Sequence, residues 1–265
     1  MSDPLSCTPS DILVGIDLAW STGATGLAAV DGTGRLVCLG RATTDDQIDT
    51  WLASLSGPPS VVALDAPLVV PNQTGQRPAE TMIGRAYGSF GASAHSANRT
   101  LLGGEPRAMR LAERFGWIID PKTRPTPSGT VCIEVYPHPA LVGLFGLPYR
   151  VDYKKGSTAK RVAGFAHLAG LLESIAELHV GEHPRWKEIQ GVIDSPAAGD
   201  LARIEDEIDA VVCAHLAWLW HHNPASLEVY GSLADGYIVA PPPPTHHPGK
   251  PTPPAAKARS ARTRL

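Results

Sequence analysis

Two stretches of continuous hydrophobic residues each carry a single aspartate. Asp17 lies in the run 12–20, and Asp65 lies in the run 61–70. Apolar runs of this length, rich in Val, Ile and Leu, are typical of strands that are buried on both faces of a sheet. A lone carboxylate in such a strand costs several kcal/mol of desolvation unless it is paired, hydrogen-bonded or bound to a metal. The pattern therefore predicts two buried strands whose aspartates have a specific role.

The residues between these runs predict a meander followed by a crossover helix. Residues 25–39 have the pattern of two strands joined by an Asp/Gly-rich hairpin turn. Residues 44–55 have helical spacing, and Gly57-Pro58-Pro59 ends that helix. A strand, a helix and a strand in this order predict that the second apolar run lies parallel to the first and beside it. Asp17 and Asp65 are then neighbours.

The second half of the chain has a different pattern. The segment 71–130 is irregular and rich in Gly, Pro and Arg, with one good helix at 106–115, so we expect it to be an insertion. A fifth strand at 130–137 carries Glu134 in its centre, and a helical stretch follows at about 159–177. The alternation of strands and helices predicts an α/β domain.

A last predicted helix, at about 201–221, opens with the acidic sequence Glu205-Asp206-Glu207-Ile208-Asp209. Acids in the first turn of a helix are favoured by its dipole. However, Asp209 lies about one turn after Asp206, and like charges at that spacing are slightly destabilising unless a cation lies between them. We expect one or both to face Asp17 and Asp65; the alternative is dipole stabilisation with a surface salt bridge.

Composition indicates one folded domain and a separate tail. The chain has 265 residues, of which 43% are hydrophobic, enough for one large domain with an insertion. Residues 241–265 hold five basic residues and no acid, which leaves 18 basic against 26 acidic residues in the rest. We expect a flexible N-terminus at 1–10, a domain at 11–240 and a disordered, Pro-rich basic tail at 241–265. The tail could hold phosphates or be merely solvated.

No apolar stretch approaches the roughly 20 residues of a transmembrane helix, and Met1-Ser2-Asp3-Pro4 lacks the start of a secretory signal. We therefore expect a cytoplasmic protein without membrane contact. The four cysteines lack the close pairs of a zinc site, so we expect reduced, packed thiols; they are Cys7, Cys38, Cys132 and Cys213.

Acids on distant segments are typical of a divalent-metal site for phosphoryl transfer. Mg²⁺ and Mn²⁺ prefer oxygen ligands, and two such ions about 3.5–4 Å apart can activate a water and stabilise the leaving oxygen of a phosphodiester. We expect Asp17 to bridge both ions, with Asp65 and Asp209 each holding one. Asp206 or Glu134 would complete a ligand shell or orient the water.

Basic residues supply candidate contacts to the phosphates of DNA or RNA. Arg107, Arg110 and Arg114 share one face of the predicted helix 106–115. They form either a phosphate-facing stripe or a solvated surface. The candidates for substrate binding are Arg77, Arg107, Arg110, Lys154 and Lys155.

Several motifs, taken in order, resemble those of the DUF429 family, whose members are described as predicted nucleases of the ribonuclease H-like fold. The resemblance spans about 11–240 and rests mainly on Gly15-Ile16-Asp17-Leu18-Ala19-Trp20, Leu64-Asp65-Ala66-Pro67, Glu134-Val135-Tyr136-Pro137-His138-Pro139 and Glu205-Asp206-Glu207-Ile208-Asp209-Ala210. It implies a mixed five-stranded sheet with antiparallel strands 1–3, strands 4 and 5 parallel to strand 1, and flanking helices.

Within that superfamily the acids resemble those of the Holliday-junction resolvase branch. There, an Asp on strand 1, an acid on strand 4 and an Asp-x-x-Asp pair on the last helix bind two divalent ions. Asp17, Asp65, Asp206 and Asp209 match these positions, although strand 4 usually carries Glu in that branch. Glu134 has no agreed equivalent there.

Two other functions are compatible with the sequence. A non-catalytic module that binds nucleic acid or protein could retain a nuclease scaffold, because a fold does not fix a function. Actin-like or sugar-kinase-like ATP-dependent phosphotransferases share this sheet and an Asp on strand 1. Against the second alternative, the hairpin after Asp17 lacks a convincing phosphate loop, and 265 residues leave little room for a duplicated domain.

Overall fold

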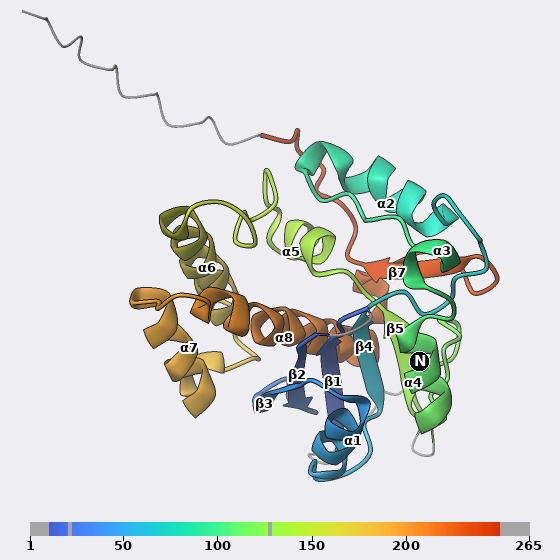
Figure 1. Ribbon diagram of the computed structural model, residues 1–265, viewed down its shortest axis with the longest axis horizontal. Helices are drawn as coiled ribbons and strands as arrows, with labels where there is room; N and C mark the ends of the chain where they lie inside the picture. The colour runs from blue at the N-terminus through green and yellow to red at the C-terminus, as the bar shows by residue number, and fades with distance from the viewer. Residues whose placement is uncertain (1–10, 21–22, 127–128, 250–265) are drawn as a thin grey trace, which may run out of the picture.

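A mixed sheet forms the centre of the structure (Figure 1). The computed structural model describes residues 11–20, 23–126 and 129–249. In these residues the main sheet has five strands in the order β3-β2-β1-β4-β5. The first three are antiparallel neighbours, and β4 and β5 run parallel to β1, as predicted. The strands are β1 (Ile12–Asp17), β2 (Thr25–Asp31), β3 (Leu36–Ala42), β4 (Val61–Asp65) and β5 (Val131–Glu134).

The register of β1 and β4 brings the two strand aspartates together. Asp17 pairs with Asp65 in the parallel ladder, and each is the last residue of its strand. The preceding residues of both strands are fully buried, because apolar side chains on both faces of each strand pack into the core. The prediction that Asp17 and Asp65 are neighbours is confirmed.

The predicted hairpin between β2 and β3 is also present. Gly34 has a φ of 95°, and its N–H donates to the carbonyl of Asp31. The carboxylate of Asp31 accepts hydrogen bonds from the N–H and the hydroxyl of Thr33. This turn sets the antiparallel register of the two strands.

Four predicted helices are found close to their expected bounds. They are α1 (Asp45–Ala53), α4 (Arg107–Phe115), α6 (Thr158–Glu173) and α8 (Asp200–His222). The helix α5 (Pro137–Phe145) follows β5 directly and begins with proline at its first position, where a missing N–H costs nothing.

Other elements were not predicted. The insertion contains α2 (Pro78–Tyr87) and the short α3 (Arg99–Leu102) in addition to α4, so it is more regular than expected. The remaining unpredicted elements are α7 (Pro184–Asp194), the hairpin β6 (Glu228–Ser232) and β7 (Gly236–Ala240), and the 3₁₀ segments Gly88–Phe90, Val180–Glu182 and Pro224–Ser226.

The hairpin β6–β7 closes the insertion against the sheet. It packs on α2, and a parallel bridge joins Val239 to Val135 just after β5. Tyr237 donates its hydroxyl hydrogen bond to the carbonyl of Ile119 at 2.8 Å. Figure 1 shows this hairpin with α2, α3 and α4 on the β5 side of the sheet, whereas α6 and α7 lie on the β3 side.

The chain continues along the domain after residue 240. The Tyr87 hydroxyl donates to the carbonyl of Pro241, and the N–H of Gly249 donates to the carbonyl of Pro148 at 2.8 Å. Residues 241–249 therefore contact the domain, although we expected them to belong to the disordered tail. The predictions for 1–10 and for 250–265 fall outside the described residues.

Within the described residues, no helix is long and apolar enough to cross a membrane. Cys132 and Cys213 are buried free thiols whose pKa is raised by burial, and Cys38 is a half-buried free thiol. Cys7 lies outside the described residues.

Two glycines allow α8 to lie unusually close to the sheet, across β1, β2 and β4 (Figure 1). A Cβ atom on Gly15 would lie 2.1 Å from the backbone nitrogen of Ala214 and 2.2 Å from the carbonyl oxygen of Ala210. A Cβ atom on Gly26 would lie 1.8 Å from the carbonyl oxygen of Asp206. Any larger residue would push the helix away from the sheet, because backbone atoms cannot move aside as a flexible side chain can.

Gly15→Ala should therefore destabilise the protein strongly. We expect the free energy of unfolding to fall by more than about 3 kcal/mol, since the added methyl group meets helix backbone. The matched control is Gly170→Ala in α6, where a Cβ meets nothing within 4 Å. This control should gain about 0.5–1 kcal/mol from helix propensity. Urea denaturation measures both, and equal stabilities would contradict the close packing.

Candidate functional site

Three of the predicted carboxylates come together where β1 and β4 end against α8. Asp17 and Asp65 remain partly exposed, whereas Asp209 on α8 has no exposed surface. The pKa of Asp17 is well above its usual range, first because of burial and then because of the nearby charges of Asp65 and Asp209. We call Asp17, Asp65 and Asp209 the acid cluster.

The pKa of Asp65 is also raised. Burial raises its pKa to about 7, with further contributions from Asp209 and Glu134, while Lys154 acts in the opposite direction. Like charges in a poorly solvated place favour protonation or the binding of a cation. At neutral pH, nearby positive charge therefore does not fully balance the negative charge of the acid cluster.

Lys154 supplies part of that charge. Its Nζ lies 2.7 Å from Oδ2 of Asp209 and 3.7 Å from Oε1 of Glu205. Burial lowers the pKa of Lys154, but Asp209, Asp17 and Asp65 outweigh this and raise it above its usual value. Lys154 was expected to contact substrate, and the structure places its ammonium on the acid cluster instead.

Asp209 is held in place by the residue before this lysine. The hydroxyl of Tyr153 donates to Oδ1 of Asp209 at 2.7 Å, and Tyr153 is fully buried. Oδ2 of Asp209 lies 2.7 Å from the ammonium of Lys154, which is its charged partner among the described residues. One oxygen is thus held by a neutral hydroxyl, and the other already faces a cation, the ammonium of Lys154.

Asp206 lies at the edge of the acid cluster. Its Oδ2 is 3.3 Å from a guanidinium nitrogen of Arg41 on β3. Burial raises the pKa of Asp206, Arg41 lowers it, and Asp209 raises it again. Of the two candidates on α8, Asp209 therefore faces Asp17 and Asp65 most directly, and Asp206 acts from one side.

The donor chemistry of the acid cluster suits Mg²⁺ or Mn²⁺. It offers carboxylate oxygens from three segments, and the pKa values of Asp17 and Asp65 are raised even with Lys154 present. In the described residues, however, no three His, Cys, Asp or Glu side chains are gathered closely enough to hold a metal ion as they stand. A metal ion would have to draw the carboxylates inward and compete with Lys154 for Asp209.

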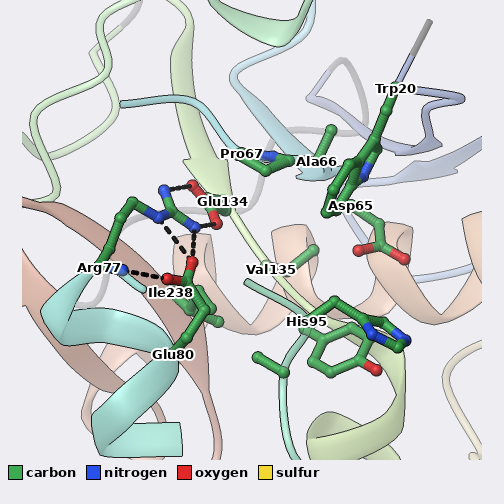
Figure 2. A pocket seen from close by; sticks show the side chains of 12 residues that line it. Trp20, Asp65, Ala66, Pro67, Arg77, Glu80, His95, Glu134, Val135 and Ile238 are labelled. Carbon is green, nitrogen blue, oxygen red and sulfur yellow. Dashed lines mark hydrogen bonds and ion pairs between the residues drawn. The ribbon is translucent and has the colours of Figure 1, made fainter. Parts of the chain in front are cut away.

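Glu134 belongs to a separate, fully paired cluster, shown in Figure 2. Nη1 of Arg77 donates to Oε2 of Glu134 at 2.9 Å, and Nη2 donates to Oε1 at 2.5 Å. Oε2 also accepts the N–H of Leu68, and Nε of Arg77 donates to Glu80. This pairing occupies Glu134 and Arg77, which are 3% and 1% exposed, and leaves neither free for the catalytic or substrate-binding role expected of it.

The arginine face of α4 is directed largely at acids of α1. Arg107 is buried and donates to Asp45 through Nε at 2.8 Å and Nη2 at 2.6 Å. Arg114 pairs with Asp46 and Asp49. Arg110 is exposed and donates to the carbonyl of Glu105. Arg107 is therefore a structural residue rather than the expected phosphate contact, and Arg110 stays a candidate.

Two pockets adjoin the acid cluster. The first, which we call the Trp20 pocket, has a volume of about 340 Å³ and includes Asp65 in its wall (Figure 2). The second, which we call the Lys155 pocket, has a volume of about 630 Å³ and includes Lys154. His95 and Tyr136 line both pockets. Sequence reasoning did not find the Trp20 pocket or the role of Tyr153.

Fold and site together define an α/β protein with an electrostatically strained carboxylate cluster at the ends of its central strands. The family model described as "Protein of unknown function (DUF429)" matches residues 15–231, which include the acid cluster and Lys154. The chain belongs to this family, as its motifs indicated. No curated protein and no solved structure matches the chain.

Because of the acid cluster, we expect the folding stability of the protein to fall as pH rises. Since the pKa of Asp65 is higher in the folded than in the unfolded protein, its contribution is present below about pH 4 and is lost as pH rises to about 7. In EDTA at pH 8, Asp65→Asn should therefore raise the melting temperature above that of the wild type, with a smaller gain at pH 5. Asp194→Asn, on the exposed end of α7, should change neither value. A lower melting temperature of Asp65→Asn at pH 8 would contradict the assignment.

Proposed function

We propose that this protein is a divalent-metal-dependent nuclease of the ribonuclease H-like fold that hydrolyses phosphodiester bonds in DNA or RNA. The observation that carries the proposal is the acid cluster: carboxylates from β1, β4 and α8 face one another although their charges repel. Such strain is typical of functional sites, because a fold selected for stability alone would remove it.

The strand arrangement supports the ribonuclease H-like assignment. Three antiparallel strands are followed by two strands parallel to the first, and the long final helix α8 lies across them. The acids occupy the positions expected from the resolvase resemblance, at the end of β1, at the end of β4 and on α8.

In the proposed mechanism Asp17, Asp65 and Asp209 hold Mg²⁺ or Mn²⁺, and Asp206 completes the ligand set. When bound, the metal activates a water and stabilises the leaving oxygen. Tyr153 keeps Asp209 oriented through its hydrogen bond. Lys154, whose side chain is 31% exposed, pairs with Asp209 and also lines the Lys155 pocket, so its ammonium would lie between the carboxylates that would hold the metal and a substrate phosphate in that pocket.

A second function, a non-catalytic module that binds nucleic acid, is favoured by one observation. The ammonium of Lys154 lies 2.7 Å from Asp209 and already offsets part of the negative charge that a metal would neutralise. If this ion pair is permanent, the acid cluster is a structural remnant. The two proposals therefore differ in whether a metal ion can displace Lys154.

Cleavage of nucleic acid by the purified protein tests the nuclease proposal. With Mg²⁺ or Mn²⁺ it should cut at least one of single-stranded, duplex, hybrid or branched nucleic acid, and Asp17→Asn should abolish cutting while its thermal unfolding remains cooperative. Asp194→Asn should cut at the rate of the wild type, because this residue is exposed on α7. If wild type and Asp17→Asn both bind nucleic acid and are equally inert on all four substrates, the module proposal replaces the nuclease.

Metal-dependent stability separates the two proposals without an activity assay. Lys154→Met removes the ammonium beside buried Asp209, so in EDTA at pH 8 it should lower the free energy of unfolding by about 3 kcal/mol. Lys155→Met, at an exposed position, should cost little. Millimolar Mn²⁺ should raise the melting temperature of Lys154→Met more than that of the wild type, because the ion no longer competes with a lysine. Equal or absent shifts would contradict a metal site at the acid cluster.

A further inference from the structure

An exposed tryptophan stands beside the acid cluster. Trp20 is 39% exposed, and it follows Ala19, whose carbonyl accepts a hydrogen bond from Nη1 of Arg107 at 2.9 Å. Tryptophan is highly buried on average, and at protein surfaces it is enriched where partners bind. Figure 2 shows Trp20 over the Trp20 pocket, near the carboxylate of Asp65.

The Trp20 pocket suits a flat, uncharged group. The space of about 340 Å³ at this pocket is continuous with solvent, so a flat group would enter it edge-on and stay partly exposed. Trp20 and Tyr136 provide aromatic surface, and the apolar lining residues are Ala66, Pro67, Ala94, Val135 and Ile238. In its wall Arg77 is paired with Glu80 and Glu134, and Asp65 adds a further carboxylate, so negative charge is in excess and an anion is disfavoured.

The Lys155 pocket has the opposite character. Arg150, Lys154 and Lys155 line it, and its acid, Asp152, is paired with Lys160 at 3.0 Å and with Arg150 at 3.2 Å. Lys155 is exposed. A positive pocket of this kind suits a phosphate group, whose binding releases counterions.

We propose that the Trp20 pocket takes one unpaired nucleobase and the Lys155 pocket takes the adjacent phosphates, so that the substrate is single-stranded nucleic acid. The proposal rests on the proposed function and names its substrate class. Because the pockets share His95 and Tyr136, and because Asp65 lines one and Lys154 the other, a strand that fills both passes the acid cluster.

The substrate is expected to be single-stranded because its base must be free to enter the Trp20 pocket. A base inside a duplex has both faces stacked and its edge paired, so it cannot enter the Trp20 pocket without leaving the helix. Stacking on aromatic side chains accepts any base and has little sequence preference. The chemistry therefore specifies an unpaired base rather than a sequence.

Binding in EDTA tests this without cleavage. The probes are a labelled oligothymidylate of about 12 nucleotides, an abasic strand of equal length with the same phosphates, and a duplex. The wild type should bind oligothymidylate about tenfold more tightly than either of the others, as stacking of a base on an aromatic residue provides. Fluorescence anisotropy gives the three dissociation constants.

Variants assign the effect to the two pockets. Trp20→Ala should weaken binding of oligothymidylate about tenfold and leave the abasic strand unchanged, and Trp20→Phe should retain most of the affinity. The matched control is Leu233→Ala, between β6 and β7, because Leu233 is also 39% exposed; it should bind like the wild type. Lys155→Ala should weaken oligothymidylate and abasic strand alike and reduce the salt dependence by about one phosphate contact.

The inference and the nuclease proposal can fail separately. Equal affinity of the wild type for oligothymidylate and the abasic strand, or a duplex bound as tightly as oligothymidylate, would overturn the inference whether or not Mn²⁺ supports cleavage. An equal loss on both strands in Trp20→Ala would also overturn it. A third outcome is base-dependent binding that is lost in Trp20→Ala, together with no cleavage in the presence of Mg²⁺ or Mn²⁺. This outcome would support the base pocket and contradict the nuclease proposal.

Discussion

The site depends on how closely α8 approaches the sheet. Gly15 on β1 and Gly26 on β2 have no side chain, so the helix backbone occupies the space where Cβ atoms would lie. This contact fixes the depth at which Asp209, halfway along the helix, meets the ends of β1 and β4. A helix farther from the sheet would carry its carboxylate away from Asp17 and Asp65. The same packing that stabilises the core therefore forces together charges that destabilise it.

Two groups of buried charges with opposite energetic character lie side by side. Arg77, Glu80 and Glu134 satisfy one another through short hydrogen bonds and join α2 to β5, so they have a structural role. In the acid cluster, Asp17 and Asp65 have raised pKa values even with Lys154 present. The first group needs nothing further, whereas the second gains stability from any added cation. We infer that the second group is the functional one.

Much of this arrangement could be predicted from local sequence. The apolar runs around Asp17 and Asp65 give the strands, and the crossover rule gives their pairing. In the sequence, Glu134 lies in an apolar strand just as these aspartates do. Its partner Arg77 is 57 residues away, and no local periodicity indicates that the two side chains pair. Lys154 and Lys155 are equivalent in sequence, and only the tertiary fold turns the first onto Asp209 and the second to solvent. The helix α2 and the hairpin β6–β7 stabilise each other across more than 140 residues, and local patterns do not contain such contacts.

We propose that the acid cluster is a metal site in which Lys154 takes the place of the ion when no metal is bound. Anomalous scattering from crystals soaked in Mn²⁺ tests it most directly. We expect Mn²⁺ density between Asp17 and Asp209, with Nζ of Lys154 moved away from its position 2.7 Å from Asp209. Crystals that bind no Mn²⁺ there and keep the Lys154–Asp209 ion pair intact would contradict it.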